Sequence, residues 1–328
     1  MRPRVDDSDE EWAEGLKLPI RRKYAKRLVK SVSRELTPAE GNGVVAEIFP
    51  NQASVRLDGG EARRLCGYRM RSLSFGGSSR ERSPVCVGDR VRVEASVIVG
   101  RCQRRNKLMR SAPNSRDPLL HAVAANLDLL VVVASAREPE FTPGIVDRFL
   151  VAASAQGIPA LLCVNKCDLL EPGAQRSWSH YSGAGVGLVE TDALEGEGTS
   201  VLAKLIRGKT AAFCGHSGVG KTSLLRRLLG DGRMGRVGVL SRSTGMGKHT
   251  TTGAVLLPGP ADSFWIDTPG IMNFTLVGVD KELLLENFPE LKAASARCGK
   301  DCLHDAERDC ALRGMARHQS YRDILGSL

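Results

Sequence analysis

The chain has 328 residues, of which 42% are hydrophobic and 26% are charged, with 47 Lys and Arg against 37 Asp and Glu. This length is sufficient for two or three domains, and the composition excludes a fibrous or membrane-spanning protein. The longest apolar run, at 127–136, is too short to cross a bilayer and the N-terminus has no apolar signal core, so we expect a cytoplasmic protein that binds no membrane.

The positive charge is concentrated in the N-terminal third. Residues 1–117 carry 25 Lys and Arg against 15 Asp and Glu, which accounts for the whole net charge of +10. The densest part, at 21–34, belongs to a charged extension that we place at residues 1–38. A solvated helix face explains this pattern, and so does contact with a nucleic-acid backbone, which gains from counterion release.

Residues 39–112 are predicted to form a small all-β barrel. Short β-branched runs are broken there by Gly, Asn and Asp, as in "VCVGDRVRVEASVIVG" at 85–100, and no helical period is apparent. A Gly-Asp connection between two strands is common in both OB and SH3-like barrels. The segment "SAPNSRDP" at 111–118 then marks a linker.

After the linker the pattern becomes that of an α/β domain, which we place at residues 113–278. Strands without polar alternation are separated by helices, which predicts a parallel sheet covered on both faces. At the first helix, 142–157, Thr142 is predicted to cap the N-terminus and Pro143 to occupy the first turn. The predicted strands lie at 127–135, 159–166, 210–215, 251–258 and 263–270, and a second helix lies at 221–230.

The stretch "FCGHSGVGKTSLL" at 213–225 matches a phosphate-binding loop. Its glycines allow successive N–H groups to face a phosphate at the positive end of the following helix. Lys221 is predicted to reach the β- and γ-phosphates, and Thr222 to ligate Mg²⁺. The expected nucleotide-binding residues are Gly215, His216, Ser217, Gly218, Val219, Gly220, Lys221, Thr222 and Ser223.

Two later stretches are predicted to complete the magnesium and γ-phosphate site. Asp267 ends an apolar strand, where it can hold Mg²⁺ through water, and the N–H of Gly270 can bind the γ-phosphate. Three consecutive threonines at 250–252 lie in the Gly-rich loop "GMGKHTTTG". One of them is expected to ligate Mg²⁺ in the GTP state; we favour Thr251, with both neighbours still open.

The stretch "CVNKCDLL" at 163–170 predicts which base is bound. The carboxylate of Asp168 can accept hydrogen bonds from N1–H and the 2-amino group of guanine, and adenine presents neither donor. Asn165 can bond the base and brace the phosphate loop, while the stem of Lys166 can lie along the purine. Together with Cys167, these residues end a buried parallel strand, where doubly wound sheets bind their ligands.

The two motifs occur in an unusual order, because the base reader precedes the phosphate loop. Parallel strands occupy fixed places in a sheet whichever of them is made first. If the natural ends are joined and another loop is opened, the same site can reassemble, provided that the original termini lie close together. The sequence therefore predicts a circularly permuted nucleotide-binding domain.

The last fifty residues, 279–328, are predicted to be helical and to bind a metal. The stretch "RCGKDCLHDAERDCAL" at 297–312 contains three cysteines and one histidine, a set that suits one tetrahedral structural Zn²⁺. Large apolar residues are few beyond residue 280, so we expect the metal to supply much of the folding energy of this tail. The predicted ligands are Cys298, Cys302, His304 and Cys310.

Over about residues 40–328 the chain resembles the RsgA (YjeQ) family of circularly permuted GTPases, which act on the small ribosomal subunit. The motifs that carry the resemblance are "RNKLMR", "IVDRFLVAA", "VNKCDL", "GHSGVGKTSL", "GKHTTT", "IDTPG", "ENFPEL" and the Cys/His cluster. The resemblance implies an N-terminal OB barrel, a permuted GTPase domain and a zinc-binding helical tail. It also implies GTP hydrolysis, giving GDP, coupled to late maturation of the small subunit; we expect a monomer that contacts 16S-type rRNA.

The sequence departs from the family pattern in two places. The loop that supports the base usually contains a Ser-Ala pair, whereas "VETDALEGEG" at 189–198 offers Thr191, Asp192 and Ala193 as the nearest equivalents. The family's first two cysteines tend to be one residue further apart than Cys298 and Cys302. The residues of the base-supporting loop therefore stay open at this point.

The predicted catalytic residues are His249, Thr251, Lys221 and Gly270. Position 271, where some GTPases carry a water-orienting Gln, is Ile, so intrinsic hydrolysis is expected to be slow. The family resemblance implies that His249 is catalytic, and we expect the ribosome to order its loop. The rival interpretations are a GTP-gated RNA-binding module with incidental hydrolysis and a permuted GTPase of large-subunit assembly; a P-loop kinase of small molecules is disfavoured by the "NKCD" motif.

Overall fold

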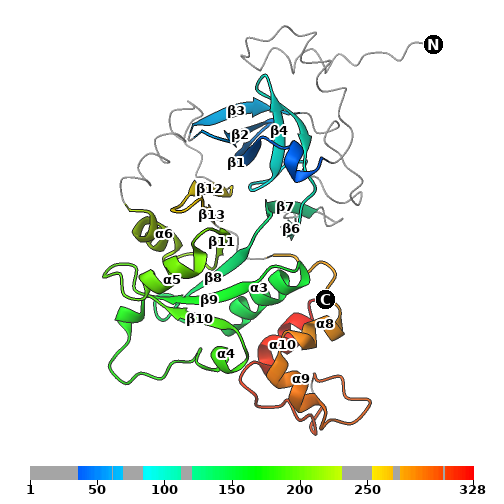
Figure 1. Ribbon diagram of the computed structural model, residues 1–328. Helices are drawn as coiled ribbons and strands as arrows, with labels where there is room; N and C mark the ends of the chain where they lie inside the picture. Colours follow the sequence, from blue (N-terminus) through cyan, green and yellow to red (C-terminus); the bar gives the residue numbers. More distant parts are fainter. Residues whose placement is uncertain are drawn as a thin grey trace, which may run out of the picture. The chain divides into compact units, whose positions relative to one another are not determined.

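The computed structural model describes residues 36–60, 62–68, 84–111, 120–230, 253–268, 274–305 and 307–328 (Figure 1). The chain divides into two compact units, Met1–Arg104 and Arg105–Leu328. The domain bounds expected from the sequence, at 38/39, 112/113 and 278/279, stay predictions, and the basic segment 21–34 lies outside the described residues. Within the described part of the chain, no helix is both long and apolar enough to cross a membrane.

In the first unit, five strands close into a barrel in the order β1-β2-β3-β5-β4-β1. Closure occurs because β1 pairs with both β2 and β4, while Gly67 joins β3 to Val97 of β5 in parallel. Buried Val45, Val55 and Val91 fill the interior, as expected when alternate residues of each strand point inward. The predicted barrel is thus confirmed, with strands at Gly43–Phe49 (β1), Gln52–Leu57 (β2), Arg63–Gly67 (β3), Arg90–Glu94 (β4) and Val97–Arg101 (β5).

The second unit contains a sheet with the strand order β10-β9-β8-β11-β13-β12 (Figure 1). The strands from β10 to β13 in this order run parallel. Near-continuous burial along β8 agrees with a central strand that is covered on both faces. The strands span Leu129–Ser135 (β8), Ala160–Asn165 (β9), Gly187–Glu190 (β10), Thr210–Cys214 (β11), Val255–Pro258 (β12) and Phe264–Asp267 (β13).

The prediction of an entirely parallel sheet is wrong at one strand. Strand β12 pairs with β13 antiparallel, with Val255 opposite Asp267. The two strands form a hairpin whose turn contains Ala261 and Asp262, both with positive φ. Two consecutive positive φ values give a turn whose twist matches that of a hairpin, but they are usually supplied by Gly or Asn. The Ala-Asp pair gave no sequence signal of this turn.

Helices cover both faces of this sheet. Helices α5 (Thr199–Ile206) and α6 (Lys221–Leu229) contribute Leu202, Leu224 and Leu225 to a core with one face of β8. Helix α3 (Pro143–Ala155) packs on β8 and β9, and it is buried nearly all round. Pro143 starts this helix as predicted. Thr142 occupies the N-cap position, but the predicted capping by its side chain is wrong: its oxygen accepts no capping hydrogen bond, and its hydroxyl donates to Glu140 O at 3.2 Å.

The remaining elements of the second unit connect the sheet to its surroundings. Strands β6 (Lys107–Ser111) and β7 (Leu120–Ala125) form a separate antiparallel hairpin. A 3₁₀ turn, η3 (Cys167–Leu169), follows β9, and the short helix α4 (His180–Gly183) precedes β10. Helices α8 (Lys281–Glu286), α9 (Pro289–Ser295) and α10 (His318–Leu325) form the tail.

The helices of the tail form an apolar core together with α3. Leu284, Phe288, Leu291 and Tyr321 are fully buried there together with Val151 of α3. The few large apolar residues beyond residue 280 thus form a core in which α3 supplies one wall, while the contribution of the metal to folding stays a prediction.

Candidate nucleotide site and metal cluster

The predicted phosphate loop connects β11 to α6, at the carboxyl end of the parallel strands. Gly215, Gly218 and Gly220 all have positive φ. A Cβ on Gly215 would lie 2.0 Å from Val133 O, and one on Gly220 would lie 2.3 Å from Asn165 Nδ2. Glycine is thus required at both positions, by backbone conformation and by close approach of neighbouring strands. The loop leads into the positive N-terminus of α6, where an anion is stabilised.

Replacing Gly215 with Ala tests this constraint. The added Cβ would overlap a strand carbonyl that cannot move alone, so we expect a loss of about 2–4 kcal/mol in the free energy of unfolding, together with weakened nucleotide binding. Gly230→Ala is the matched control, since Gly230 also has positive φ (78°) but no described atom lies within 4 Å of the place that its added methyl group would take. Chemical denaturation of both variants is the measurement, and equal losses would contradict the steric argument.

Lys221 and Asp267 form the charged centre of the site. Lys221 Nζ donates to Gly215 O at 2.7 Å and to His216 O at 2.8 Å, so it closes the loop on itself. Burial lowers the pKa of Lys221, and the nearby carboxylate of Asp267 opposes that shift. Burial likewise raises the pKa of Asp267, with Lys221 acting in the opposite direction. The two side chains therefore stabilise each other's charges in a poorly hydrated place.

The residues present fit a magnesium ion. Asp267 Oδ1 is buried and has no hydrogen-bond partner among the described residues, which leaves an oxygen ready for a metal-bound water. The side chain of Thr222, the first hydroxyl of α6, is exposed. Among the other residues predicted to bind the nucleotide, Val219 is buried, while Ser217 and Ser223 are exposed. His249, Thr251 and Gly270, predicted to complete this site, lie outside the described residues.

Asn165 ties the base reader to the phosphate loop. Its Nδ2 donates to Val219 O at 3.0 Å, and its Oδ1 accepts from Thr191 Oγ1 at 3.2 Å and from Ala193 N at 3.1 Å. The residue is 1% exposed, so these bonds satisfy a buried amide. One side chain thus joins three loops, those after β9, β10 and β11.

The base-reading loop exposes the carboxylate expected to select guanine. Lys166 has φ 63°, and its Nζ donates to Glu138 O. Asp168 is exposed and makes no hydrogen bond to the described residues that would compete with a base. Burial raises the pKa of the Cys167 thiol to about 11, so it stays neutral beside Asp168 at physiological pH.

The structure shows which residues of the candidate base-supporting loop lie beside the base reader. The loop follows β10, and its conformation is fixed by Asp192, whose two oxygens accept from Leu194 N at 2.7 Å and from Glu195 N at 3.1 Å. Asp192 therefore fixes an Asx-type turn at the start of this loop. The sequence signal was the Asp before "GEG", but only the bonds from Thr191 and Ala193 to Asn165 show that this loop belongs to the site.

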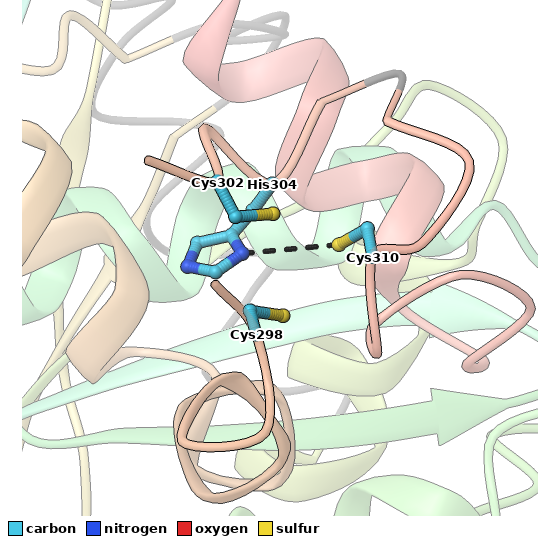
Figure 2. A group of neighbouring side chains, drawn as sticks. All are labelled: Cys298, Cys302, His304 and Cys310. Atoms are coloured by element: carbon cyan, nitrogen blue, oxygen red, sulfur yellow. Dashed lines mark hydrogen bonds between the residues drawn. The ribbon is translucent and has the colours of Figure 1, made fainter. Parts of the chain in front are cut away.

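A second candidate site lies in the tail. The three thiol sulfurs and one imidazole nitrogen of Cys298, Cys302, His304 and Cys310 all lie within 4.8 Å of one another (Figure 2). Cys310 Sγ and His304 Nδ1 are 3.8 Å apart. A tetrahedral zinc with bonds of about 2.0–2.3 Å places its ligand atoms at roughly such distances, so the four residues fit this metal.

Neighbouring groups orient the metal-binding side chains. Ala311 N donates to Cys298 Sγ at 3.3 Å, as backbone amides often do to thiolates that bind a metal. His304 has φ 62°, and its carbonyl lies 3.0 Å from Nε2 of the buried His318. All four ligand positions are filled by protein, which is typical of a structural site.

Comparisons with known proteins agree with this arrangement. The profile of the RsgA GTPase family matches residues 101–277. A small ribosomal subunit biogenesis GTPase RsgA from Azotobacter vinelandii is 37% identical over 335 residues, covering 94% of each chain. One from Pseudomonas putida is 40% identical over 259 residues, covering 74% of each chain.

Solved structures share the fold. YjeQ from Thermotoga maritima matches with a TM-score of 0.63 and 26% identity, covering 88% of this chain and 98% of its own. YloQ, described as a circularly permuted GTPase, matches with a TM-score of 0.57 and 23% identity, covering 88% of this chain and 94% of its own, which shows the fold alone. With a base reader that precedes the phosphate loop in one sheet, this chain belongs to the RsgA GTPase family of GTP hydrolases.

Proposed function

We propose that the protein binds the small ribosomal subunit and couples GTP hydrolysis to a late step of its maturation. The observation that carries this proposal is the set of three hydrogen bonds made by the Asn165 side chain. They join the base-reading loop to the phosphate loop, although the two motifs occur in permuted order along the chain. The extensive identity to relatives named as small ribosomal subunit biogenesis GTPases supports the choice of subunit. The alternatives stay testable in the same assay.

In this proposal GTP lies across the carboxyl ends of β9 and β11. Asp168 reads guanine, the N–H groups of residues 215–220 surround the phosphates, and Lys221 leaves its loop carbonyls to reach the β- and γ-phosphates. Thr222 and Asp267 would hold Mg²⁺, which would supply positive charge beside the phosphates. Asn165 holds the base-reading loop and the phosphate loop in fixed positions relative to each other. We retain His249, Thr251 and Gly270 as the proposed water-orienting, metal-binding and γ-phosphate residues.

The first unit is proposed to bind rRNA. The closed strand order β1-β2-β3-β5-β4 is that of an OB barrel, a fold that often binds oligonucleotides. Arg64 on β3 and Arg92 on β4 are exposed, and the excess positive charge of residues 1–117 suits a phosphate backbone. The 16S-type rRNA of the small subunit is the proposed partner of a cytoplasmic monomer that binds no membrane.

The tail is proposed to be a zinc-binding helical domain. Three thiolates and one imidazole would hold Zn²⁺ in a closed shell that shapes residues 298–310. Its helices pack on α3 of the GTPase unit, so the tail is placed to follow changes in that unit. This layout supports a division into barrel, permuted GTPase domain and tail.

GTP turnover should be measured alone, with small subunits and with large subunits, each at two salt concentrations. We expect stimulation by the small subunit, and binding that weakens about tenfold or more between about 50 and 200 mM salt. His249→Ala is expected to lose about 10²-fold of the stimulated rate. Stimulation by large subunits instead would favour large-subunit assembly, and binding without stimulation would favour a GTP-gated RNA-binding module; either result contradicts the proposal.

A further inference from the structure

A buried cation fixes the tail to the GTPase unit. Arg317, just before α10, is 1% exposed, and its Nε and Nη2 both lie 2.8 Å from Oδ1 of the fully buried Asp147 on α3. Its Nη1 lies 3.2 Å from Glu290 on α9. Removing one partner of such a buried pair leaves the other charge uncompensated, so this contact holds the tail in one position.

The same guanidinium reaches a third segment, between β9 and β10. It lies 4.8 Å from the ring centroid of Tyr181 in α4, close enough for a cation–π contact. Phe141 packs against Tyr181 at 5.9 Å and against Trp178 at 5.4 Å between ring centroids. The tail is therefore in contact, through the buried ring of Tyr181, with the segment that enters β10, and the half-buried Phe141 links Tyr181 to Trp178.

Trp178 then connects these rings to the end of β10. The indole is 2% exposed, and its Nε1 donates to Glu190 Oε1 at 2.7 Å. Arg176 Nε lies 3.2 Å from the same oxygen. The indole N–H of Trp178 and the guanidinium of Arg176 together hold the carboxylate of Glu190 in one place.

Glu190 is the last residue of β10 and immediately precedes the base-supporting loop. Thr191 N donates to Val164 O at 2.7 Å, and Cys167 N donates to Thr191 O at 3.2 Å. Thr191 thus contacts the base reader on both sides of Asn165. A displacement of Glu190 would therefore move the base-supporting loop. This loop is bonded to Asn165 and to Cys167, the residue before Asp168.

We propose that the Trp178–Glu190 hydrogen bond is a positioning contact for guanine binding, and that it is set by the tail through Arg317, Tyr181 and Phe141. These five residues are called the aromatic relay. The inference rests on the proposed reading of guanine by Asp168. Through the aromatic relay, the position of the tail determines how well the base-supporting loop is ordered, and so determines nucleotide affinity.

Trp178→Phe tests the first half of the proposal, because it keeps an aromatic ring and removes the N–H donor. We expect the Kd for a fluorescent GDP analogue to rise about tenfold, a typical size for coupling between sites. The kcat at saturating GTP stays unchanged while KM rises, because the change acts on the base end. A merely structural role would instead lower stability without this separation of KM from kcat.

Arg317→Lys tests the second half. Lysine keeps the charge but loses the planar fork that holds Asp147 while lying on Tyr181. We expect GDP binding to weaken about fivefold in the wild-type background and not to weaken further when Trp178 is already Phe. Additive effects of the two changes would overturn the aromatic relay, because independent sites add.

Trp265→Phe is the matched control. Trp265 is equally buried, but its Nε1 has no hydrogen-bond partner among the described residues, so we expect GDP affinity to stay unchanged. Thermal unfolding of each variant confirms that it is folded. If Trp178→Phe binds GDP as tightly as the wild type, the inference is overturned and the proposed function stands; if the wild type holds ADP as tightly as GDP, the proposed function itself is overturned.

Discussion

Replacing Asp168 with Asn is expected to weaken GTP binding by roughly 10³–10⁴-fold, because the amide cannot accept from both N1–H and the 2-amino group of guanine. The Asn side chain can donate to a carbonyl at that position, and xanthine carries one. The variant should therefore bind XTP more tightly than GTP. Competition of GTP, XTP and ATP against a fluorescent nucleotide measures the change.

The exposed position of Asp168 makes this test clean. Its carboxylate has no hydrogen bond within the described structure, so the substitution removes no contact that stabilises the fold. Asp262→Asn, in the exposed turn between β12 and β13, is the matched control for the loss of one negative charge. Unchanged GTP affinity in the Asp168 variant would contradict base reading by this residue.

Replacing Cys310 with Ser is expected to abolish stoichiometric zinc binding and to loosen residues 298–310. Zinc binds small zinc-binding peptides with an apparent free energy of about 10–16 kcal/mol when all four ligands are present. Removing one of the four ligands is therefore expected to remove most of the affinity. We expect helices α8–α10 to stay folded, because Leu284, Phe288, Leu291 and Tyr321 remain buried in the core with α3, to which Cys310 is only one contributor. Zinc content and amide hydrogen exchange, residue by residue, measure the two parts of this result.

The expected pattern separates two sources of order in the tail. Exchange should rise in the metal-binding loop and stay slow at Leu284 and Tyr321, both of which are fully buried. Cys66→Ala, at a buried thiol of the barrel core, is the control and should leave zinc content unchanged. Melting of the whole tail would instead mean that the apolar core is too small to hold it without metal.

The sequence was informative wherever chemistry depends on neighbouring residues. The phosphate loop, the base reader and the Cys/His cluster are each local, and a parallel sheet brings the first two together whatever their order. For this reason the permuted arrangement was predictable before the structure. The local motifs also predicted Thr251 and Gly270, and the family resemblance implied His249; all three stay predictions.

Other features depend on residues far apart in the chain, and no local pattern reports them. Arg317 and Asp147 are separated by 170 positions, and nothing in the sequence around either residue indicates that the two form an ion pair. The antiparallel β12 was missed because its turn uses Ala261 and Asp262 in place of the usual residues. Thr142 occupies the N-cap position of α3, but its side chain makes no capping hydrogen bond, which residue type alone could not show.

The hydrogen bonds of Asn165 also have a consequence for how the protein folds during its synthesis. Synthesis starts at the N-terminus, so β8 and β9 leave the exit tunnel well before β11, and the bond from Asn165 to Val219 must wait for residues 54 positions later. Until then the amide of Asn165 has no phosphate loop to hold. The two nucleotide motifs can therefore act together only after Val219 has emerged.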